Sequence, residues 1–166
     1  MNNISLRQWK DEDAEALAAI ADNKNVWNNL RDQLPHPYTI DDARDWITHC
    51  KNQKPLVNFA IIYNGEVAGS IGCVPKADVY CRNVEIGYFI GEKFWGKGIA
   101  TEAVRILIEY ILNHFEAVRI YAEVFAHNKA SMKVLQKNGF YLESIRRRGA
   151  YKNQKIIDDY VWVKLL

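Results

Sequence analysis

The feature that most constrains the fold is the segment Glu85–Thr101, in which an apolar strand runs through a glycine-rich turn into a helix. Gly96, Gly98 and Ala100 carry almost no side chain, so a ligand can closely approach the backbone N–H groups at the helix start. The dipole of a helix favours negative charge at that end. The segment therefore predicts a phosphate-binding turn between a strand and a helix.

Two better-known phosphate motifs nearly match this turn. Gly91–Lys97 has the spacing of a nucleotide-triphosphate loop, but Gly98 stands where a Ser or Thr must hold magnesium. Gly96–Thr101 offers two glycines of a dinucleotide fingerprint, but Thr101 occupies the position of the third. Both motifs are disfavoured, and an ordinary strand-to-helix turn with a glycine cap stays the alternative to a phosphate site.

Composition limits the class of protein. With 166 residues, 49% of them hydrophobic and 25% charged, the chain has the balance of one compact domain, which we expect to span residues 1–166. The net charge of +2 is too small to indicate nucleic acid as a partner, and the basic run Arg146–Arg148 is typical of a solvated strand edge. The sequence has neither a membrane-length apolar run nor the apolar core of a signal peptide, so we expect no membrane partner and a cytoplasmic location.

The cysteines and histidines do not indicate a metal site. Cys50, Cys73 and Cys81 are odd in number and form no C-x-x-C pair, which predicts buried or idle thiols. The histidines lack metal-ligand spacing, so we expect no metal. They are His36, His49, His114 and His127.

Helix signals occur in four segments, which are Asp11–Ala21, Thr39–Cys50, Ala100–Phe115 and Asn128–Gly139. Thr39 and Asp42 have the spacing of an N-cap and its partner, and Gly139 has the position of a C-terminal glycine. Between the first two segments, Pro35 and Pro37 must break any helix.

Strand signals occur in seven segments, which are Ile4–Gln8, Leu56–Tyr63, Val67–Val74, Val84–Ile90, Val118–Phe125, Phe140–Ile145 and Ile156–Leu165. Asn64–Gly65 joins the second and third as a hairpin, and the last two enclose a loop that contains Gly149. The pattern predicts a mixed α/β (α+β) domain in which most strand pairs are antiparallel and at least one strand-helix-strand crossover occurs.

Three motifs in a fixed order give the chain a family resemblance: Glu85–Tyr88, Trp95–Ala103 and Asn128–Phe140. They resemble the GNAT superfamily of acyl-CoA-dependent N-acetyltransferases, most closely the branch that acetylates the N-termini of ribosomal proteins. The resemblance covers nearly the whole chain. It implies the GNAT fold, a single mixed and mostly antiparallel twisted sheet of about six to seven strands flanked by about four helices, with splayed central strands at the cofactor site.

The resemblance implies acetyl-CoA as cosubstrate and no metal. In this family the backbone of the glycine turn holds the pyrophosphate of coenzyme A, and the matching residues are Gly96, Lys97, Gly98, Ala100 and Thr101. The strand backbone at Phe89 and Ile90 would pair with the pantetheine amides. Trp95 stands where the family usually has Gln or Arg, a departure that leaves the backbone donors intact.

Transfer of an acetyl group to an amine requires a group that accepts a proton from the ammonium. Glu85 lies on the strand expected beside pantetheine, with Gly87 and Phe89 on its face, and is the predicted base, directly or through water. The alternative is an exposed strand glutamate or a structural ion pair with a nearby arginine. Glu123, on the following strand, is the second choice.

The departing thiolate also needs a proton. Many relatives use a Tyr seven residues after the motif asparagine, but that position is Leu135 here. The branch that the chain resembles has a serine at the position of Ser131, and this hydroxyl is predicted to donate to the sulfur. The local alternatives are a first-turn helix role for Ser131 and an ordinary N-cap role for Asn128, which the family places against the cofactor.

The acceptor is expected to bind at irregular segments that carry aromatic residues, namely Trp27, Asn28, Leu30, Tyr38 and the loop around Tyr151. The predicted function is direct transfer of an acetyl group from acetyl-CoA to a primary amine, either the α-amine of a protein N-terminus or a small amine such as a polyamine or an amino sugar. A CoA-binding sensor or interaction module with weak catalysis is the alternative, and a nucleotide-triphosphate enzyme is a third. The sequence leaves open whether the protein is a monomer or a homodimer.

Overall fold

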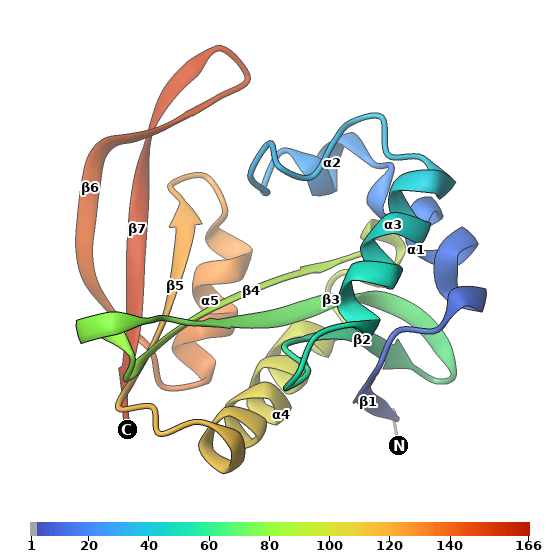
Figure 1. Cartoon of the computed structure of the whole chain (residues 1–166). Helices are drawn as coiled ribbons and strands as arrows, with labels where there is room; N and C mark the ends of the chain where they lie inside the picture. Colours follow the sequence, from blue (N-terminus) through green and yellow to red (C-terminus); the bar gives the residue numbers. More distant parts are fainter. Residues whose placement is uncertain (1–2) are drawn as a thin grey trace. The chain divides into compact units, whose positions relative to one another are not determined.

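The computed structural model describes residues 3–166 (Figure 1). Its helices and strands, in chain order, are β1 (Ile4–Arg7), α1 (Ala14–Ala21), α2 (Lys24–Trp27), α3 (Ile40–Lys51), β2 (Asn58–Tyr63), β3 (Glu66–Pro75), β4 (Asn83–Ile90), α4 (Ile99–His114), β5 (Arg119–Phe125), α5 (Lys129–Lys137), β6 (Tyr141–Lys152) and β7 (Lys155–Leu165). Three short 3-10 helices are η1 (Asp11–Asp13), η2 (Asp78–Tyr80) and η3 (Glu92–Phe94).

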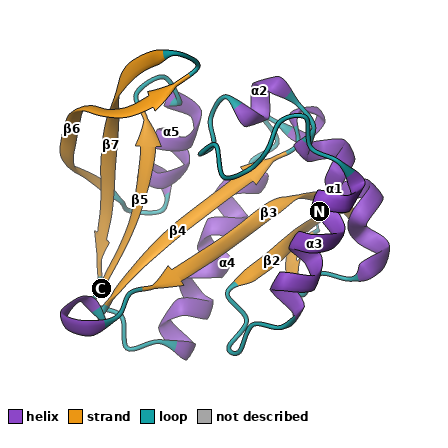
Figure 2. Ribbon diagram, turned by 45° about the horizontal axis from the view of Figure 1, so that its top comes forward, coloured by secondary structure: helices purple, strands orange, loops and turns teal. Residues whose placement is uncertain are grey.

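The strands form one hydrogen-bonded sheet in the order β1-β2-β3-β4-β5-β7-β6 (Figure 2). The pairs β1 with β2, β2 with β3, β5 with β7 and β6 with β7 are antiparallel, whereas β4 and β5 are parallel. The parallel pair is joined through α4, which is the predicted crossover. The predicted mixed α/β fold with a mostly antiparallel sheet is confirmed.

The described chain forms two compact units. The first contains the residues up to Gly72 together with Tyr88–Ala103, and the second contains Cys73–Gly87 together with Val104–Leu166. The strands β3 and β4 and the helix α4 contribute residues to both units. A single domain over residues 1–166 stays a prediction.

Local signals in the first unit act as expected. Thr39 caps α3, because its hydroxyl accepts from the Asp42 N–H at 3.2 Å while the Asp42 carboxylate accepts from the Thr39 N–H at 2.8 Å. Asn64 and Gly65 have φ angles of 50° and 89° in the hairpin turn between β2 and β3. Only residues that tolerate the left-handed region form such a turn, so the capping pair and the hairpin are both confirmed.

Strand β5 gives the second unit one apolar and one polar sheet face. Ile120, Ala122 and Val124 are buried, whereas the alternating residues Tyr121 and Glu123 are only partly covered. A strand directs successive side chains to opposite faces. The predicted base of second choice, Glu123, therefore lies on the same face as Tyr121.

The predicted loop around Gly149 is misplaced. β6 continues to Lys152, and the chain turns at Asn153–Gln154, where both φ angles are positive at 51° and 59°. Residues 147–149 instead form a bulge opposite Asp158. The Asp158 carboxylate accepts from the Arg148 N–H at 2.9 Å and from the Arg147 guanidinium at 2.7 Å, and these bonds lower the pKa of Asp158 in that order of importance. The bulge therefore rests on a contact between strands that no local pattern contains.

Candidate active site

The glycine turn opens the N-terminus of α4. Gly96 and Gly98 have φ angles of +76° and +77°, and no atom lies within 4 Å of a Cβ built on either residue. A hydrogen bond at the start of the helix joins the Glu102 N–H to the Gly98 carbonyl at 3.2 Å. The helix therefore begins beside the open space at the two glycines, which is the geometry that an anion requires.

The segment before the turn is fixed within the first unit. The Glu92 carboxylate accepts one hydrogen bond from the Asn23 amide at 2.7 Å and another from the Asn25 amide at 2.9 Å. Asn23 also caps α2 through its side-chain oxygen. Phe94 and Ile99, on either side of the turn, are buried. Buried anchors and a doubly bonded carboxylate therefore set the position of the glycines between them.

Positive charge lies close to the turn. The Lys97 Nζ is 5.4 Å from the ring centroid of Phe94 and 5.7 Å from that of Tyr63, and the Lys93 Nζ is 4.6 Å from the Phe94 centroid. Lys93 also pairs with Glu66 at 3.2 Å, whereas no described carboxylate pairs with Lys97. The charge of Lys97 is therefore available to an anion at the turn.

The end of β4 has a contact that the sequence did not indicate. The Trp95 indole N–H donates to the Ile90 carbonyl at 2.7 Å, so this carbonyl already uses one of its two lone pairs. The Phe89 carbonyl lies 2.2 Å from the position that a Cβ at Gly69 would take, and therefore faces β3. Of the two residues predicted to pair with pantetheine, Phe89 is half-buried and Ile90 is buried.

Glu85 is held by two donors in the second unit. Its Oε2 atom lies 2.6 Å from the Lys76 Nζ and 3.3 Å from the Tyr121 hydroxyl, and its side chain is 14% exposed. Burial alone would lower the pKa of Lys76, but the hydrogen bonds to Glu85 and Tyr121 outweigh burial and raise it. The ladder between β4 and β5 ends at Glu85, and nothing lies within 4 Å of a Cβ built on Gly87. Glu85 is thus a carboxylate in an ion pair with Lys76, next to open space at Gly87.

Glu123 is bound by an arginine that also lies near Asp159. The Arg146 guanidinium donates to Glu123 and also lies 3.5 Å from the buried carboxylate of Asp159. The hydrogen bond with Glu123 is the largest cause of the raised pKa of Arg146. Arg146 therefore holds Glu123 and Asp159 in one cluster of charges.

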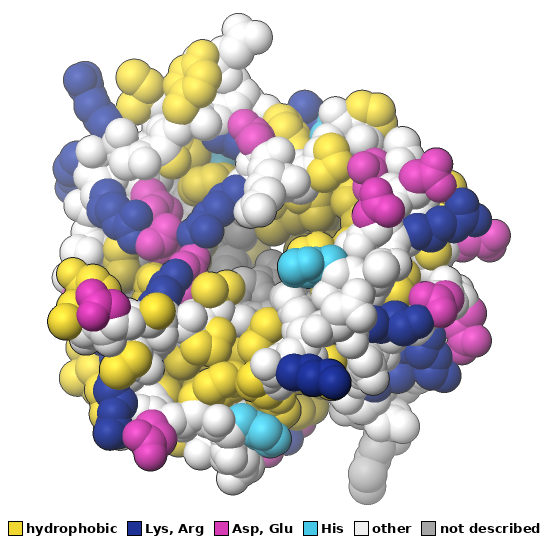
Figure 3. Space-filling view, viewed as in Figure 1, with side chains coloured by type: hydrophobic (Ala, Val, Ile, Leu, Met, Phe, Trp, Pro, Cys, Tyr) yellow, Lys and Arg dark blue, Asp and Glu magenta, His cyan; other side chains and the backbone are white. Residues whose placement is uncertain are grey.

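On the face drawn in Figure 3, acidic and basic side chains interleave instead of separating into single-sign regions.

Asn128 and Ser131 lie together at the start of α5. The Asn128 side chain accepts from the Ser131 N–H at 3.2 Å, which confirms the N-cap interpretation of Asn128. Both residues are half-buried. Leu135 is fully buried, so the position at which many relatives carry a tyrosine is part of the core here. A hydroxyl on this helix that reaches a cofactor would therefore have to come from Ser131.

The residues expected to recognise the acceptor differ in exposure. Trp27 donates to the Leu34 carbonyl at 2.9 Å and stacks on His36 at 5.5 Å, so it organises its own loop. Tyr38 is buried, and burial raises its pKa to about 12. Tyr38 is therefore part of the core, whereas Tyr151 is exposed. The two non-aromatic residues of the set, Asn28 and Leu30, are half-buried, as is Trp27.

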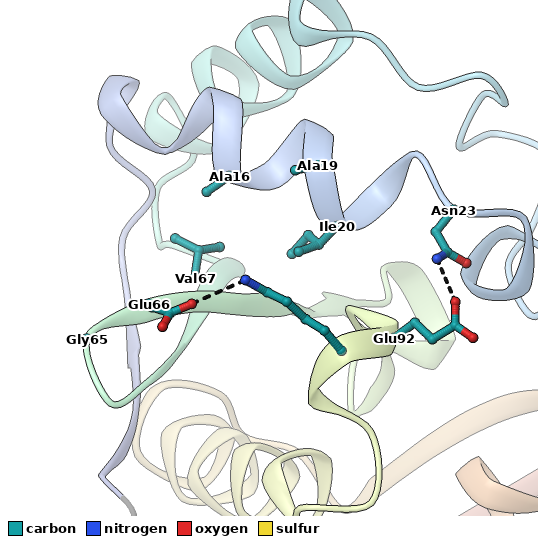
Figure 4. Close-up of a pocket in the computed structure, with 9 residues that line it drawn as sticks. Ala16, Ala19, Ile20, Asn23, Gly65, Glu66, Val67 and Glu92 are labelled. Atoms are coloured by element: carbon teal, nitrogen blue, oxygen red, sulfur yellow. Dashed lines mark hydrogen bonds and ion pairs between the residues drawn. The ribbon is translucent and has the colours of Figure 1, made fainter.

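Two cavities are lined by residues other than the predicted site residues. One of 480 Å³ in the first unit lies beside α1 and the start of β3, where Lys93 reaches Glu66 and Asn23 reaches Glu92 (Figure 4). The other, of 360 Å³, is in the second unit, and its lining residues are Lys76, Ala77, Tyr80, Asn83, Arg119 and Tyr121. The second cavity borders Glu85, because Lys76 and Tyr121 both donate to that carboxylate.

The thiols differ in reactivity. Cys50 and Cys73 are buried, and burial raises the pKa of each to about 12, whereas Cys81 is exposed. Because the thiolate is the reactive form, we expect one fast-reacting thiol in the native protein and three after denaturation. Titration with a chromogenic aromatic disulfide measures both counts. Fast modification of two or more native thiols would contradict the burial of Cys50 and Cys73.

The described residues carry neither a metal-binding cluster nor a membrane-spanning helix. Among residues 3–166, no group of three or more His, Cys, Asp and Glu side chains is arranged to bind a metal ion. None of the helices in that range combines the length and apolar character needed to cross a membrane.

The mixed sheet and the glycine turn at the start of α4 agree with the fold that the GNAT resemblance implies. A family model described as an acetyltransferase (GNAT) domain matches residues 3–141, so the chain belongs to this family and is an N-acetyltransferase. The N-acetyltransferase p20 of Bacillus licheniformis, described as uncharacterized, is 31% identical over 165 residues, which are 96% of this chain and 90% of p20.

Two further relatives have named acceptors. L-amino acid N-acetyltransferase AaaT of Escherichia coli (strain K12) is 24% identical over 166 residues, with 99% of each chain covered. Among solved structures, the chain is similar to RimL, a ribosomal L7/L12 α-N-protein acetyltransferase in complex with coenzyme A, with a TM-score of 0.85 and 21% identity. The superposition covers 98% of this chain and 94% of the RimL chain. The structural likeness to RimL shows that the fold is shared.

Several residues of the site were missed from sequence. Tyr121 alternates with Glu123 along β5, so the strand period places both on one face, but nothing in the pattern joins Tyr121 to Glu85. Lys76 and Arg146 have no spacing signal toward the carboxylates they bind. Only the pairing of strands brings these charges together.

Proposed function

We propose that the protein transfers an acetyl group directly from acetyl-CoA to a primary amine, which is the α-amine of a protein N-terminus or a small amine. The observation that carries this proposal is the open turn at Gly96 and Gly98 on the strand-turn-helix segment that also bears Glu85. Backbone donors at a helix N-terminus suit the pyrophosphate of coenzyme A.

Each predicted cofactor residue has a separate role in this proposal. The backbone around the two glycines, including Lys97, Ala100 and Thr101, binds the pyrophosphate, and the ammonium of Lys97 adds positive charge. The backbone at Phe89 and Ile90 pairs with pantetheine, and Asn128 contacts the cofactor from the start of α5.

The chemistry requires a base and an acid. The ammonium first loses a proton to Glu85, directly or through water, and the neutral amine nitrogen then attacks the thioester carbon, forming a C–N bond and releasing its second proton to solvent. The C–S bond then breaks, and the CoA thiolate takes a proton from the Ser131 hydroxyl, which regains it from solvent. Glu85 is preferred over Glu123 as the base, because Arg146 binds Glu123 and Asp159 together.

A panel of amines tests this function. Release of CoA from acetyl-CoA is measured with a protein N-terminal peptide, a polyamine, an amino sugar and an amino acid as acceptors, after subtraction of the Cys81 signal. We expect turnover with at least one of them. Tight acetyl-CoA binding without turnover on any acceptor would favour the CoA-binding sensor, and loss of both would reject the site.

Replacement of Ser131 by alanine tests the proposed acid. Because a thiolate leaves readily, we expect kcat to fall by about 10- to 100-fold, at or below the lower limit of the range for acid-base groups. The Asn128 cap uses the Ser131 backbone N–H, so helix α5 should persist. Steady-state kinetics with the best acceptor measure the change, and Ser131→Thr, which keeps a hydroxyl, is the matched control. An unchanged kcat in Ser131→Ala would remove Ser131 from the mechanism.

A further inference from the structure

We propose that the 360 Å³ cavity of the second unit binds the carboxylate of an amino-acid acceptor. This inference rests on the proposed function and names its substrate class: a molecule that carries a carboxylate next to the reacting amine. The volume is at the small end of the range for small-molecule sites. A free amino acid is of suitable size.

The cavity is lined by two cations and by no carboxylate. Lys76 and Arg119 are both among the lining residues, and their side chains are 30% and 25% exposed. Glu85, which pairs with Lys76, and Glu143, which pairs with Arg119, are not lining residues. A ligand in the cavity therefore meets positive groups that are partly removed from water, where charged hydrogen bonds are stronger.

The two cations keep donors for a ligand. An ammonium has three N–H donors and a guanidinium has five. Lys76 contacts Glu85 and Tyr121, and among residues 3–166 Glu143 is the carboxylate that Arg119 binds. Both cations also lie against the Tyr121 ring, with the Lys76 Nζ at 5.6 Å and the Arg119 Cζ at 5.0 Å from its centroid. Because both cations line the cavity next to the same ring, a carboxylate bound there can accept hydrogen bonds from either of them.

The ion pair at the edge of the cavity complements a zwitterion. Lys76 and Glu85 place a positive and a negative group 2.6 Å apart. An α-amino acid carries its ammonium and carboxylate on one carbon, so the ammonium can approach Glu85 while the carboxylate approaches Lys76 and Arg119. This orientation brings the reacting amine to the proposed base.

The remaining lining selects the side chain and excludes other amines. Tyr80 and Tyr121 present rings and Ala77 a small apolar surface, which favours an apolar or aromatic side chain. A polyamine would bring two or more positive charges toward Lys76 and Arg119. Repulsion between like charges thus disfavours this class of acceptor.

Acceptors that differ only in the carboxylate test the inference. We expect L-phenylalanine to have a KM at least about tenfold lower than L-phenylalaninamide, the factor that one charged hydrogen bond supplies. Arg119→Gln should raise the KM for phenylalanine by about tenfold, with little change in kcat and none in the KM for the amide. Arg119→Lys should restore part of the difference. An Ala-Glu peptide amide distinguishes an acidic side chain from a free α-carboxylate as the source of the anion.

Glu143→Gln is the matched control, because it breaks the same ion pair but keeps the cation. If Arg119 acts on the carboxylate, Glu143→Gln leaves the KM for phenylalanine unchanged or lowers it. Equal KM values for phenylalanine and its amide would overturn the inference and leave the proposed function intact. An equal rise in the KM for phenylalanine and the KM for its amide in Arg119→Gln would also overturn the inference.

A binding measurement keeps the two proposals separate. Isothermal titration of N-acetyl-L-phenylalanine into the protein saturated with CoA requires no turnover. We expect binding that weakens by about tenfold in Arg119→Gln. If no amine is acetylated but this difference persists, the proposed function fails and the carboxylate site stands. If amines are acetylated but this difference is absent, the carboxylate site fails.

Discussion

Replacement of Gly98 by valine should weaken acetyl-CoA binding by about 100-fold, which corresponds to about 2.7 kcal/mol. Gly98 has a φ of +77°, a conformation that costs a β-branched residue about 1–2 kcal/mol. The new methyl groups would also fill the open space at the N-terminus of α4, where the pyrophosphate is proposed to bind. Isothermal titration with acetyl-CoA measures the affinity, and thermal unfolding measures the accompanying loss of stability.

Gly65→Val is the matched control for this experiment. Gly65 also has a positive φ, of +89°, with nothing within 4 Å of a built Cβ, but it lies in the hairpin turn between β2 and β3. We expect a similar loss of stability without a loss of acetyl-CoA affinity. Wild-type affinity in Gly98→Val, or equal losses in both variants, would show that the glycine turn does not bind the cofactor.

Glu85→Gln is expected to lower kcat by about 10²- to 10⁴-fold, the usual contribution of a general base. Glutamine has nearly the same shape and can still accept hydrogen bonds from Lys76 and Tyr121, but it does not take up a proton at neutral pH. Acetyl-CoA affinity should therefore stay near the wild-type value. Steady-state kinetics and isothermal titration separate the two effects.

The comparison with Glu123→Gln decides between the two carboxylates. Because Arg146 binds Glu123, loss of the Glu123 charge should disturb this ion pair. We expect kcat to fall by less than tenfold, which corresponds to a rise in the activation free energy of less than about 1.4 kcal/mol. A large loss in Glu123→Gln with normal kcat in Glu85→Gln would exchange their roles. If both variants kept wild-type kcat, neither carboxylate would be the base, although the family assignment would stand.

The sequence predicted those elements whose signals are local. Thr39 and Asp42 form their capping pair, and Asn64–Gly65 forms its hairpin, because each interaction joins residues within a few positions of one another. The same holds for the Asn128 cap of α5. The turn between β6 and β7 was misplaced, because the bulge depends on Asp158 in the neighbouring strand.

By itself, the sequence determined the glycine turn at α4, the strand that carries Glu85 and the family to which the chain belongs. Only the tertiary structure decided the surroundings of Glu85, because Lys76 and Tyr121 are 9 and 36 positions away along the chain. The cavity lined by Lys76 and Arg119 arises in the same way, because the connection between β3 and β4 and the start of β5 both contribute to it. Helix caps and turns are governed by interactions along the chain, whereas charges that meet across strands depend on a register that no local pattern specifies.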